Sequence, residues 1–146
     1  MLTLDKYGKV IITISAVVNS GKTRIIKEII DQLLKTGNLV FDKRSVYDRT
    51  TIIEIHGKII GLASEGDTPT RLAEFLRLFK KYNCDYIVCA TKASYPGAVN
   101  RTFDEVKRFA KKEEYKIIPF FKPKGEDSPR GEDSTELKNV ILDFLK

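Results

Sequence analysis

The sequence contains no long hydrophobic run and no internal linker, and no secretory leader is expected. No stretch approaches the roughly 18 consecutive apolar residues that a membrane-spanning helix needs. The N-terminal stretch MLTLDKYGKV contains an acidic residue and only a short apolar run, so it does not predict a secretory signal. No Pro-, Gly- or Ser-rich stretch is long enough to divide the 146 residues. We therefore expect one domain over residues 1–146, a cytoplasmic location and no membrane partner.

Cysteine is also scarce, and this argues against a metal centre built on thiolates. The two cysteines, Cys84 and Cys89, fall at the start and in the interior of one predicted strand. Their spacing fits no metal-binding pattern. Two buried thiols in a reducing compartment are the expectation.

The composition is that of a globular protein with a basic surface. Hydrophobic residues make up 42% of the chain and charged residues 32%, which excludes a disordered chain. The formal net charge of +6 favours anionic partners, either nucleotides or nucleic acid. Most basic residues lie on the polar faces of predicted helices, where solvated lysine is the ordinary situation. Nucleic acid is therefore the weaker of the two expectations.

Predicted strands and helices alternate along the chain. Strands are predicted over 9–14, 38–47, 85–90 and 115–121, with a hairpin over 51–64 that turns at His56-Gly57. The first predicted helix spans 23–35, with Gly37 as its C-cap. A second helix follows the N-cap Thr68 and Pro69, and a third begins with a capping box at Thr102. A fourth helix runs up to Lys146.

Strands separated by helices of this length imply parallel βαβ units with right-handed crossovers. The hairpin adds one antiparallel pair, expected at an edge of the sheet. The predicted fold class is α/β: a three-layer α/β/α sandwich with a mostly parallel sheet and one antiparallel hairpin. The side chains expected to face the core from the helices are Ile25, Ile26, Ile29, Ile30, Leu33, Leu34, Leu72, Phe75, Leu76, Phe79, Val106, Phe109, Ala110, Leu137, Val140, Ile141, Phe144 and Leu145.

The stretch AVVNSGKT, residues 16–23, has the spacing of a phosphate-binding loop between a strand and a helix. Gly21 allows close approach of the backbone, Lys22 supplies a point charge for the β- and γ-phosphates, and the Thr23 hydroxyl is a ligand for Mg²⁺. The alternative is a Ser-Gly turn that happens to contain a lysine. A lysine in the first turn of a helix is disfavoured by the helix dipole unless an anion is present, which favours the phosphate site.

The strand, loop and helix over 10–35 resemble the P-loop NTPase superfamily, with Ala16 in place of the first glycine of its G-x-x-x-x-G-K-[ST] motif. The motif is specific for the superfamily and not for a family within it. The resemblance implies a bound nucleoside triphosphate with Mg²⁺. The candidate nucleotide-binding residues are Ala16, Val17, Val18, Asn19, Ser20, Gly21, Lys22, Thr23 and Arg24.

A P-loop enzyme also needs a carboxylate that holds Mg²⁺, and usually a group that orients the nucleophile. The best candidates are Glu65 and Asp67, which follow the apolar run 59–63. Either acid is a candidate for the metal and the other for the water, although the alternative is a plain Gly66-Asp67 turn before the next helix. The metal ligands are assigned to Thr23 and Asp67, and the catalytic residues to Lys22, Glu65 and Asp67.

Polar residues at the end of the strand over 85–90, namely Thr91, Lys92 and Ser94, are weaker candidates for contact with the γ-phosphate or a second substrate. The stretch TKAS resembles the guanine-reading motif N/T-K-x-D of GTPases, but Ser94 replaces its aspartate. ATP is therefore expected rather than GTP.

Three functions remain open: a small nucleoside triphosphatase, a kinase for a small metabolite or nucleotide, and a regulatory or nucleic-acid-associated module with little turnover. The kinase would use Arg101 and Arg108 beside a loop over 91–100, and Asp42 or Asp48 to activate the acceptor. The regulatory module would use a partner surface, for which the candidates are Lys43, Arg44 and Arg49. A homo-oligomer, in which an arginine acts across subunits, is compatible with the sequence. The favoured function is Mg²⁺-dependent triphosphate binding and hydrolysis.

Overall fold

The computed structural model describes residues 8–16, 22–45, 48–64, 68–92, 101–121 and 132–145. Over these residues the chain forms an α/β fold in which strands and helices alternate. The elements are β1 (Val10–Ala16), α1 (Lys22–Leu34), β2 (Asn38–Arg44), β3 (Arg49–Ile55), β4 (Lys58–Ala63), α2 (Pro69–Lys81), β5 (Tyr86–Lys92), α3 (Arg101–Glu113), β6 (Lys116–Phe121) and α4 (Glu132–Leu145). None of the helices in the described part of the chain is long and apolar enough to cross a membrane.

The described strands form one six-stranded sheet in the order β2-β3-β4-β5-β1-β6. The pairs β4–β5, β5–β1 and β1–β6 are parallel, so four strands end at the same edge of the sheet. The predicted hairpin forms between β3 and β4, but β2 also pairs antiparallel with β3 and occupies the edge. The hairpin therefore lies inside the sheet and not at its edge, because β2 returns alongside β3.

The hairpin turns at the two predicted residues. His56 and Gly57 have φ angles of 52° and 78°, so both lie in the left-handed region. Two consecutive left-handed residues are the requirement of a type I′ turn, whose twist matches that of the flanking strands.

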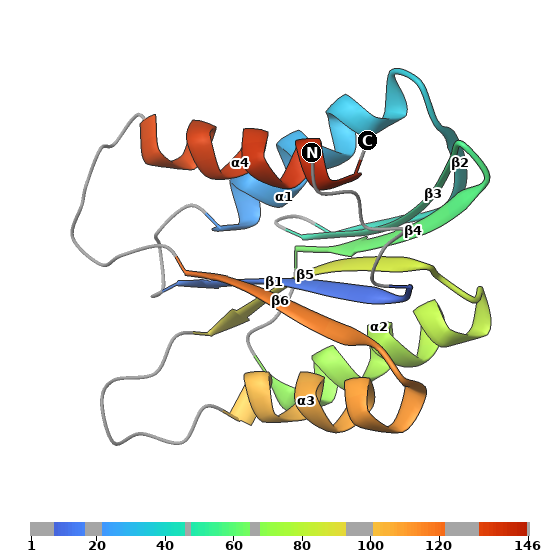
Figure 1. Ribbon diagram of the computed structural model, residues 1–146, viewed down its shortest axis with the longest axis vertical. Helices are drawn as coiled ribbons and strands as arrows, with labels where there is room; N and C mark the ends of the chain where they lie inside the picture. The colour runs from blue at the N-terminus through green and yellow to red at the C-terminus, as the bar shows by residue number, and fades with distance from the viewer. Residues whose placement is uncertain are drawn as a thin grey trace.

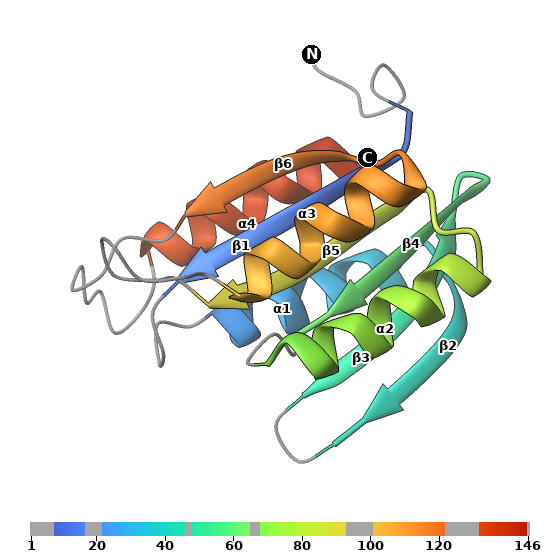
Figure 2. The same cartoon turned by 90° about the horizontal axis from the view of Figure 1, so that it is seen from below.

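Helices cover both faces of the sheet (Figure 1). α1 and α4 lie on one face, and α2 and α3 lie on the other, as the view turned by 90° also shows (Figure 2). Alternate side chains of β1 point to opposite faces: Val10, Ile12 and Ile14 join the core under α1 and α4, whereas Ile11 joins the core under α2 and α3. Burial on both faces explains why the β1 sequence reads as a continuous apolar run.

The predicted apolar faces of α1 and α2 are confirmed almost residue by residue. The buried positions are Ile25, Ile26, Ile29, Ile30 and Leu33 on α1, and Leu72, Phe75, Leu76 and Phe79 on α2. The prediction for α4 was partly wrong: Ile141 and Leu145 are buried, but Val140 is 38% exposed and Leu142 is buried instead. The apolar stripe of α4 is thus rotated by part of a turn. The predicted positions 137 and 144 lie outside the described side chains.

The helix ends were predicted with mixed success. Thr68 is the N-cap of α2, because its hydroxyl oxygen accepts a hydrogen bond from the Arg71 backbone nitrogen at 3.2 Å. The capping box at Thr102 was wrong, since α3 already begins at Arg101 and Thr102 is a buried residue of its first turn.

Gly37 follows α1 for a reason other than the predicted left-handed cap. It is not among the residues with positive φ, although its backbone nitrogen donates to the Leu33 carbonyl at 2.8 Å. A Cβ atom there would lie 2.7 Å from Cγ2 of Ile53 and 3.0 Å from the carbonyl oxygen of Glu54. Glycine is therefore required because the turn passes close to β3.

The two edge strands differ in their exposed backbone. β6 contains Pro119, which has no N–H group to donate. β2 has a register shift between Leu39 and Phe41, so that Val40 has no partner in the β3 register. Leu39 and Val40 are 52% and 43% exposed.

Candidate functional site

The carboxyl ends of β4, β5, β1 and β6 meet at one edge of the sheet, which is where ligands bind in open α/β folds. At this edge β1 ends at Ala16 and α1 begins at Lys22. The connecting residues 17–21 lie outside the described part of the chain, and so do the side chains of Ala16, Lys22 and Thr23. The described residues thus supply the strand and the helix on either side of the predicted phosphate loop.

Arg24, in the first turn of α1, already has a carboxylate partner. Its Nε atom lies 3.1 Å from Oε1 of Glu28, and the Lys138 ammonium of α4 lies 3.3 Å from the other Glu28 oxygen. Burial by itself would raise the pKa of Glu28, but the hydrogen bonds from Arg24 and Lys138 outweigh it and lower the pKa. Glu28 therefore stays ionised near neutral pH and competes with any phosphate group for Arg24.

A pair of hydroxyl groups connects the ends of β1 and β5. Ser15 and Thr91 are paired in the parallel register, and their side-chain oxygens are hydrogen bonded to each other. Thr91 is completely buried and Ser15 is partly buried. Thr91 was a weak candidate for ligand contact from the sequence; its neighbours Lys92 and Ser94 lie outside the described side chains.

Thr13, two residues before Ser15 on β1, was missed by the sequence reasoning. Its side chain is fully buried, and Oγ1 has no hydrogen-bond partner among the described residues. Because strand side chains alternate, Thr13 and Ser15 share the face of Ile11. The signal in the sequence was the two hydroxyl residues at alternate positions of an otherwise apolar strand. Buried hydroxyl groups are ordinarily hydrogen bonded, so Thr13 is an exception among the described residues.

The candidate second acids follow β4, and β4 is separated from β1 by β5. Two strand spacings correspond to about 10 Å between the ends of β1 and β4. Glu65 and Asp67 themselves lie outside the described residues. The residue before them, Ser64, is buried, and its Oγ atom accepts a hydrogen bond from the Arg49 backbone nitrogen at 2.8 Å. Ser64, which precedes these acids in the sequence, is therefore held against β3.

Arg49 is the centre of an ionic network that joins α1 to the β2–β3 pair. Its Nε and Nη2 atoms lie 2.8 Å and 3.3 Å from the two carboxylate oxygens of Asp42, and Nη1 lies 3.4 Å from Asp31 of α1. Arg49 is only 8% exposed. The prediction that Arg49 belongs to an exposed partner surface is therefore wrong, because its guanidinium is turned inward toward two carboxylates.

The carboxylate of Asp42 has several partners. Besides Arg49 it accepts hydrogen bonds from the Thr51 hydroxyl at 2.8 Å and from Arg44 at 3.0 Å. Burial would raise its pKa, but the hydrogen bonds from Arg49, Thr51 and Arg44 lower the pKa from 3.8 to about 2. So weak a base does not suit the activation of an acceptor hydroxyl near neutral pH. Asp48, the other candidate, lies within 3.4 Å of Ser64 Oγ.

A small pocket lies between the β2–β3 pair and α2. Its volume is about 130 Å³. Its lining residues are Lys43, Ser45, Thr50, Arg71, Glu74, Phe75 and Leu78. It combines two cations, the Glu74 carboxylate and two hydroxyl groups with an apolar wall.

The remaining candidates contribute less to this edge. Arg101 is the first residue of α3, and its side chain lies outside the described set. Arg108 lies two turns further along α3 and is paired with Glu105 at 2.7 Å.

Cys84 and Cys89 are buried and form no disulfide, as expected. Burial raises the pKa of both thiols to about 12, so neither is a reactive thiolate.

No cluster of three or more metal-ligating side chains occurs within the described ranges. No protein-family model matches the sequence, and no curated protein matches it. Among solved structures, the chain is similar to one described as "Crystal structure of APE1195". The TM-score is 0.49 and the sequence identity is 16%, over 94% of this chain and 76% of that one. This similarity carries no argument about function.

Proposed function

We propose that the chain is a Mg²⁺-dependent P-loop protein of the three-layer α/β/α type that binds and hydrolyses a nucleoside triphosphate, ATP in preference to GTP. In the reaction a water oxygen forms a bond to the γ-phosphorus, and the bond from that phosphorus to the β–γ bridging oxygen breaks. The products are the nucleoside diphosphate and phosphate. The observation that carries the proposal is the spacing Ala16-x4-Gly21-Lys22-Thr23 between the end of β1 and the start of α1.

Two features of the surrounding edge support this proposal. The hydroxyl groups of Ser15 and Thr91 lie near the carboxyl ends of β1 and β5, where they are hydrogen bonded to each other. A polar group beside a phosphate site gains hydrogen bonds when a ligand or its water shell binds. Ser64, the residue before Glu65, is also held against β3 by the Arg49 backbone N–H.

The donor chemistry of the proposed metal site fits Mg²⁺. Thr23 offers a hydroxyl oxygen and Asp67 a carboxylate oxygen, and hard oxygen ligands are those that Mg²⁺ prefers. Mg²⁺ usually keeps several waters and takes further oxygens from the substrate phosphates, so two protein ligands are sufficient. When bound, the metal would neutralise the charge that develops on the phosphate oxygens.

The phosphate site is tested by calorimetric titration of Lys22→Ala with a non-hydrolysable ATP analogue and Mg²⁺. Binding is expected to be abolished, because the point charge on the β- and γ-phosphates is removed. Lys27→Ala, five residues further along the same helix, is the matched control and is expected to bind like the wild type. Equal affinity of Lys22→Ala and the wild type would contradict the proposal.

The second acid is tested by phosphate release from ATP. Asp67→Asn and Glu65→Gln are each expected to reduce release, with the metal requirement shifted to higher Mg²⁺ in the variant that loses the metal ligand. Release that is insensitive to both substitutions would exclude this loop from the reaction while leaving the nucleotide site intact.

Transfer of the γ-phosphate to a small acceptor is the second candidate, and the pocket beside Lys43 and Arg71 favours it. The pocket is lined by β2 and β3, and β3 lies three strand spacings from β1, about 14 Å. That separation makes water the better placed acceptor. Phosphate release measured with and without a panel of nucleosides separates the two reactions, since an acceptor would suppress release of free phosphate.

A further inference from the structure

The two helical layers carry opposite formal charges. α2 contains four basic residues and one acidic residue, and α3 contains five basic and three acidic residues, so this pair has a net charge of +5. α1 contains three basic and two acidic residues, and α4 contains one basic and four acidic residues, which gives a net charge of −2. The excess positive charge of the chain is therefore concentrated on the face covered by α2 and α3.

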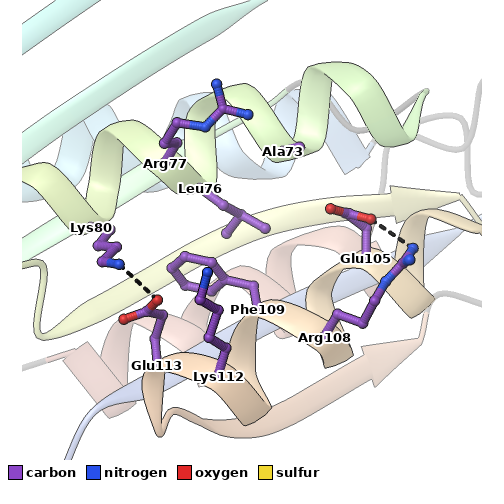
Figure 3. Close-up of a pocket in the computed structure, with 9 residues that line it drawn as sticks. All are labelled: Ala73, Leu76, Arg77, Lys80, Glu105, Arg108, Phe109, Lys112 and Glu113. Atoms are coloured by element: carbon purple, nitrogen blue, oxygen red, sulfur yellow. Dashed lines mark hydrogen bonds and ion pairs between the residues drawn. The ribbon is translucent and has the colours of Figure 1, made fainter.

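A groove of about 430 Å³ runs between α2 and α3 (Figure 3). Its lining residues are Ala73, Leu76, Arg77, Lys80, Glu105, Arg108, Phe109, Lys112 and Glu113. The cations stand on both sides, two from each helix, and Leu76 and Phe109 lie between the helices. The two helices that line the groove lie on the face of the sheet opposite to α1 and α4 (Figure 1).

Both acids of the groove are already neutralised. Lys80 of α2 lies 3.0 Å from Glu113 of α3, and Arg108 lies 2.7 Å from Glu105 (Figure 3). For Arg77 and Lys112, no ion-pair partner exists among the described residues, and both are exposed. The uncompensated charge of the groove is therefore positive, with one contribution from each helix.

We propose that the α2–α3 face, defined by Arg77, Lys80, Arg108 and Lys112, binds the sugar-phosphate backbone of a nucleic acid without reading its sequence. Cations on either side of a shallow groove suit a ligand whose negative charges repeat along its length. The face continues beyond the groove, since Lys81 and Lys111 are further exposed cations on the same two helices. This extended distribution is the electrostatic footprint of backbone recognition.

An acidic peptide is the competing ligand, and the groove suits it less well. A peptide that docks between helices needs apolar anchor sites as well as charge. Leu76 is only 1% exposed, and Phe109 packs on the Tyr115 ring with a centroid distance of 5.5 Å. Leu76 is therefore closed to a ligand and Phe109 is partly covered by its neighbour, whereas phosphate contacts need no apolar anchor.

The proposal is tested by fluorescence anisotropy with labelled duplex DNA of about 20 base pairs, the corresponding single strand, and a polyglutamate peptide of similar charge. The wild type is expected to bind the nucleic acids. The logarithm of its affinity should fall linearly with the logarithm of the salt concentration. The double variant Arg77→Glu, Lys112→Glu is expected to bind about tenfold more weakly and to lower the salt slope by about 2, because two phosphate contacts are lost.

The matched control is Lys27→Glu, Lys35→Glu, on α1 and just after its end. Both double variants change the formal net charge from +6 to +2, but the control is expected to retain wild-type affinity within about twofold. The neutral variant Arg77→Gln, Lys112→Gln should show a smaller loss, and circular dichroism confirms that each variant is folded.

Three outcomes would overturn the proposal: no binding of either nucleic acid by the wild type, equal losses in the two charge-reversed variants, or tighter binding of polyglutamate than of DNA. The last result would assign the face to an acidic protein. None of them bears on nucleotide binding, which the Lys22→Ala titration measures separately.

Discussion

The two sides of the sheet are built from different kinds of side chain. Under α1 and α4 the buried core is aliphatic apart from Tyr86. Under α2 and α3 it contains the rings of Phe75, Phe79 and Tyr115, with further aromatic residues packed against them. Phe75 and Phe79 lie 5.6 Å apart between ring centroids. One α/β sheet thus supports an aliphatic layer beneath the helix of the proposed phosphate loop and an aromatic layer beneath the basic groove.

The aromatic layer depends on space provided by the sheet itself. A Cβ atom on Gly61 of β4 would lie 2.6 Å from Cδ1 of Phe79. The large ring is accommodated only because the strand has no side chain at that point. The α1–α4 side has a different demand, since it must satisfy the charges of Asp31, Asp42 and Arg49.

The largest effect on stability is expected from Phe79→Ala. Removal of this fully buried ring leaves a cavity and should lower the free energy of unfolding by about 3–5 kcal/mol. Ile29→Ala is the counterpart in the aliphatic layer and should cost about 3 kcal/mol. Urea denaturation of both variants measures the difference, and a larger loss for Ile29→Ala would break the distinction between the layers.

Gly61→Ala tests the fit between β4 and α2. The new methyl group would overlap the Phe79 ring and should destabilise the fold by about 1–3 kcal/mol. In the Phe79→Ala background the same change should be neutral or slightly stabilising, because the overlapping ring is gone and glycine is unfavourable in a strand. The coupling in this double-mutant cycle is the decisive quantity. Additive effects would show that the overlap is relieved elsewhere.

Asp42→Asn tests the charged network of the α1–α4 side. Because the folded-state pKa of Asp42 is lowered from 3.8 to about 2, its ionised form stabilises the fold above pH 3.8 and this contribution is lost as the pH falls through 2. The wild type should therefore exceed the variant by about 2 kcal/mol at pH 5. Denaturant titrations between these pH values should show the difference shrinking with acidity. A difference that is constant with pH would contradict the assigned cause.

Local sequence patterns were sufficient to predict the helices and strands but not their order in the sheet. The face of α2 that carries Leu72 and Phe79 repeats with the helical period, and the His56-Gly57 turn is specified by its own two residues. The strands that pair with β1 are far from it in the sequence and are reached through connections that contain whole helices. No residue of Val10–Ala16 therefore identifies β5 as the partner of β1. The rotated stripe of α4 likewise depends on packing against α1.

The candidate site divides in the same way. The spacing around Lys22 is a local signal, and the phosphate loop that it predicts lies outside the described residues. The partners of Arg49 come from β2 and α1, 7 and 18 residues away, so its inward orientation could not be inferred from its surroundings in the chain. Ser15 and Thr91 are 76 residues apart and meet only because β1 and β5 are adjacent.

The two edges of the sheet have a consequence for self-association by strand pairing. An edge strand is a template for other chains when it offers an unbroken row of N–H and C=O groups. Pro119 removes one donor from β6, and the irregularity at Val40 interrupts β2, which then ends in charged residues. Neither edge strand therefore offers an unbroken row of backbone N–H and C=O groups. Concentrated protein is therefore expected to resist amyloid-like growth through these strands, even though Leu39 and Val40 are exposed to solvent.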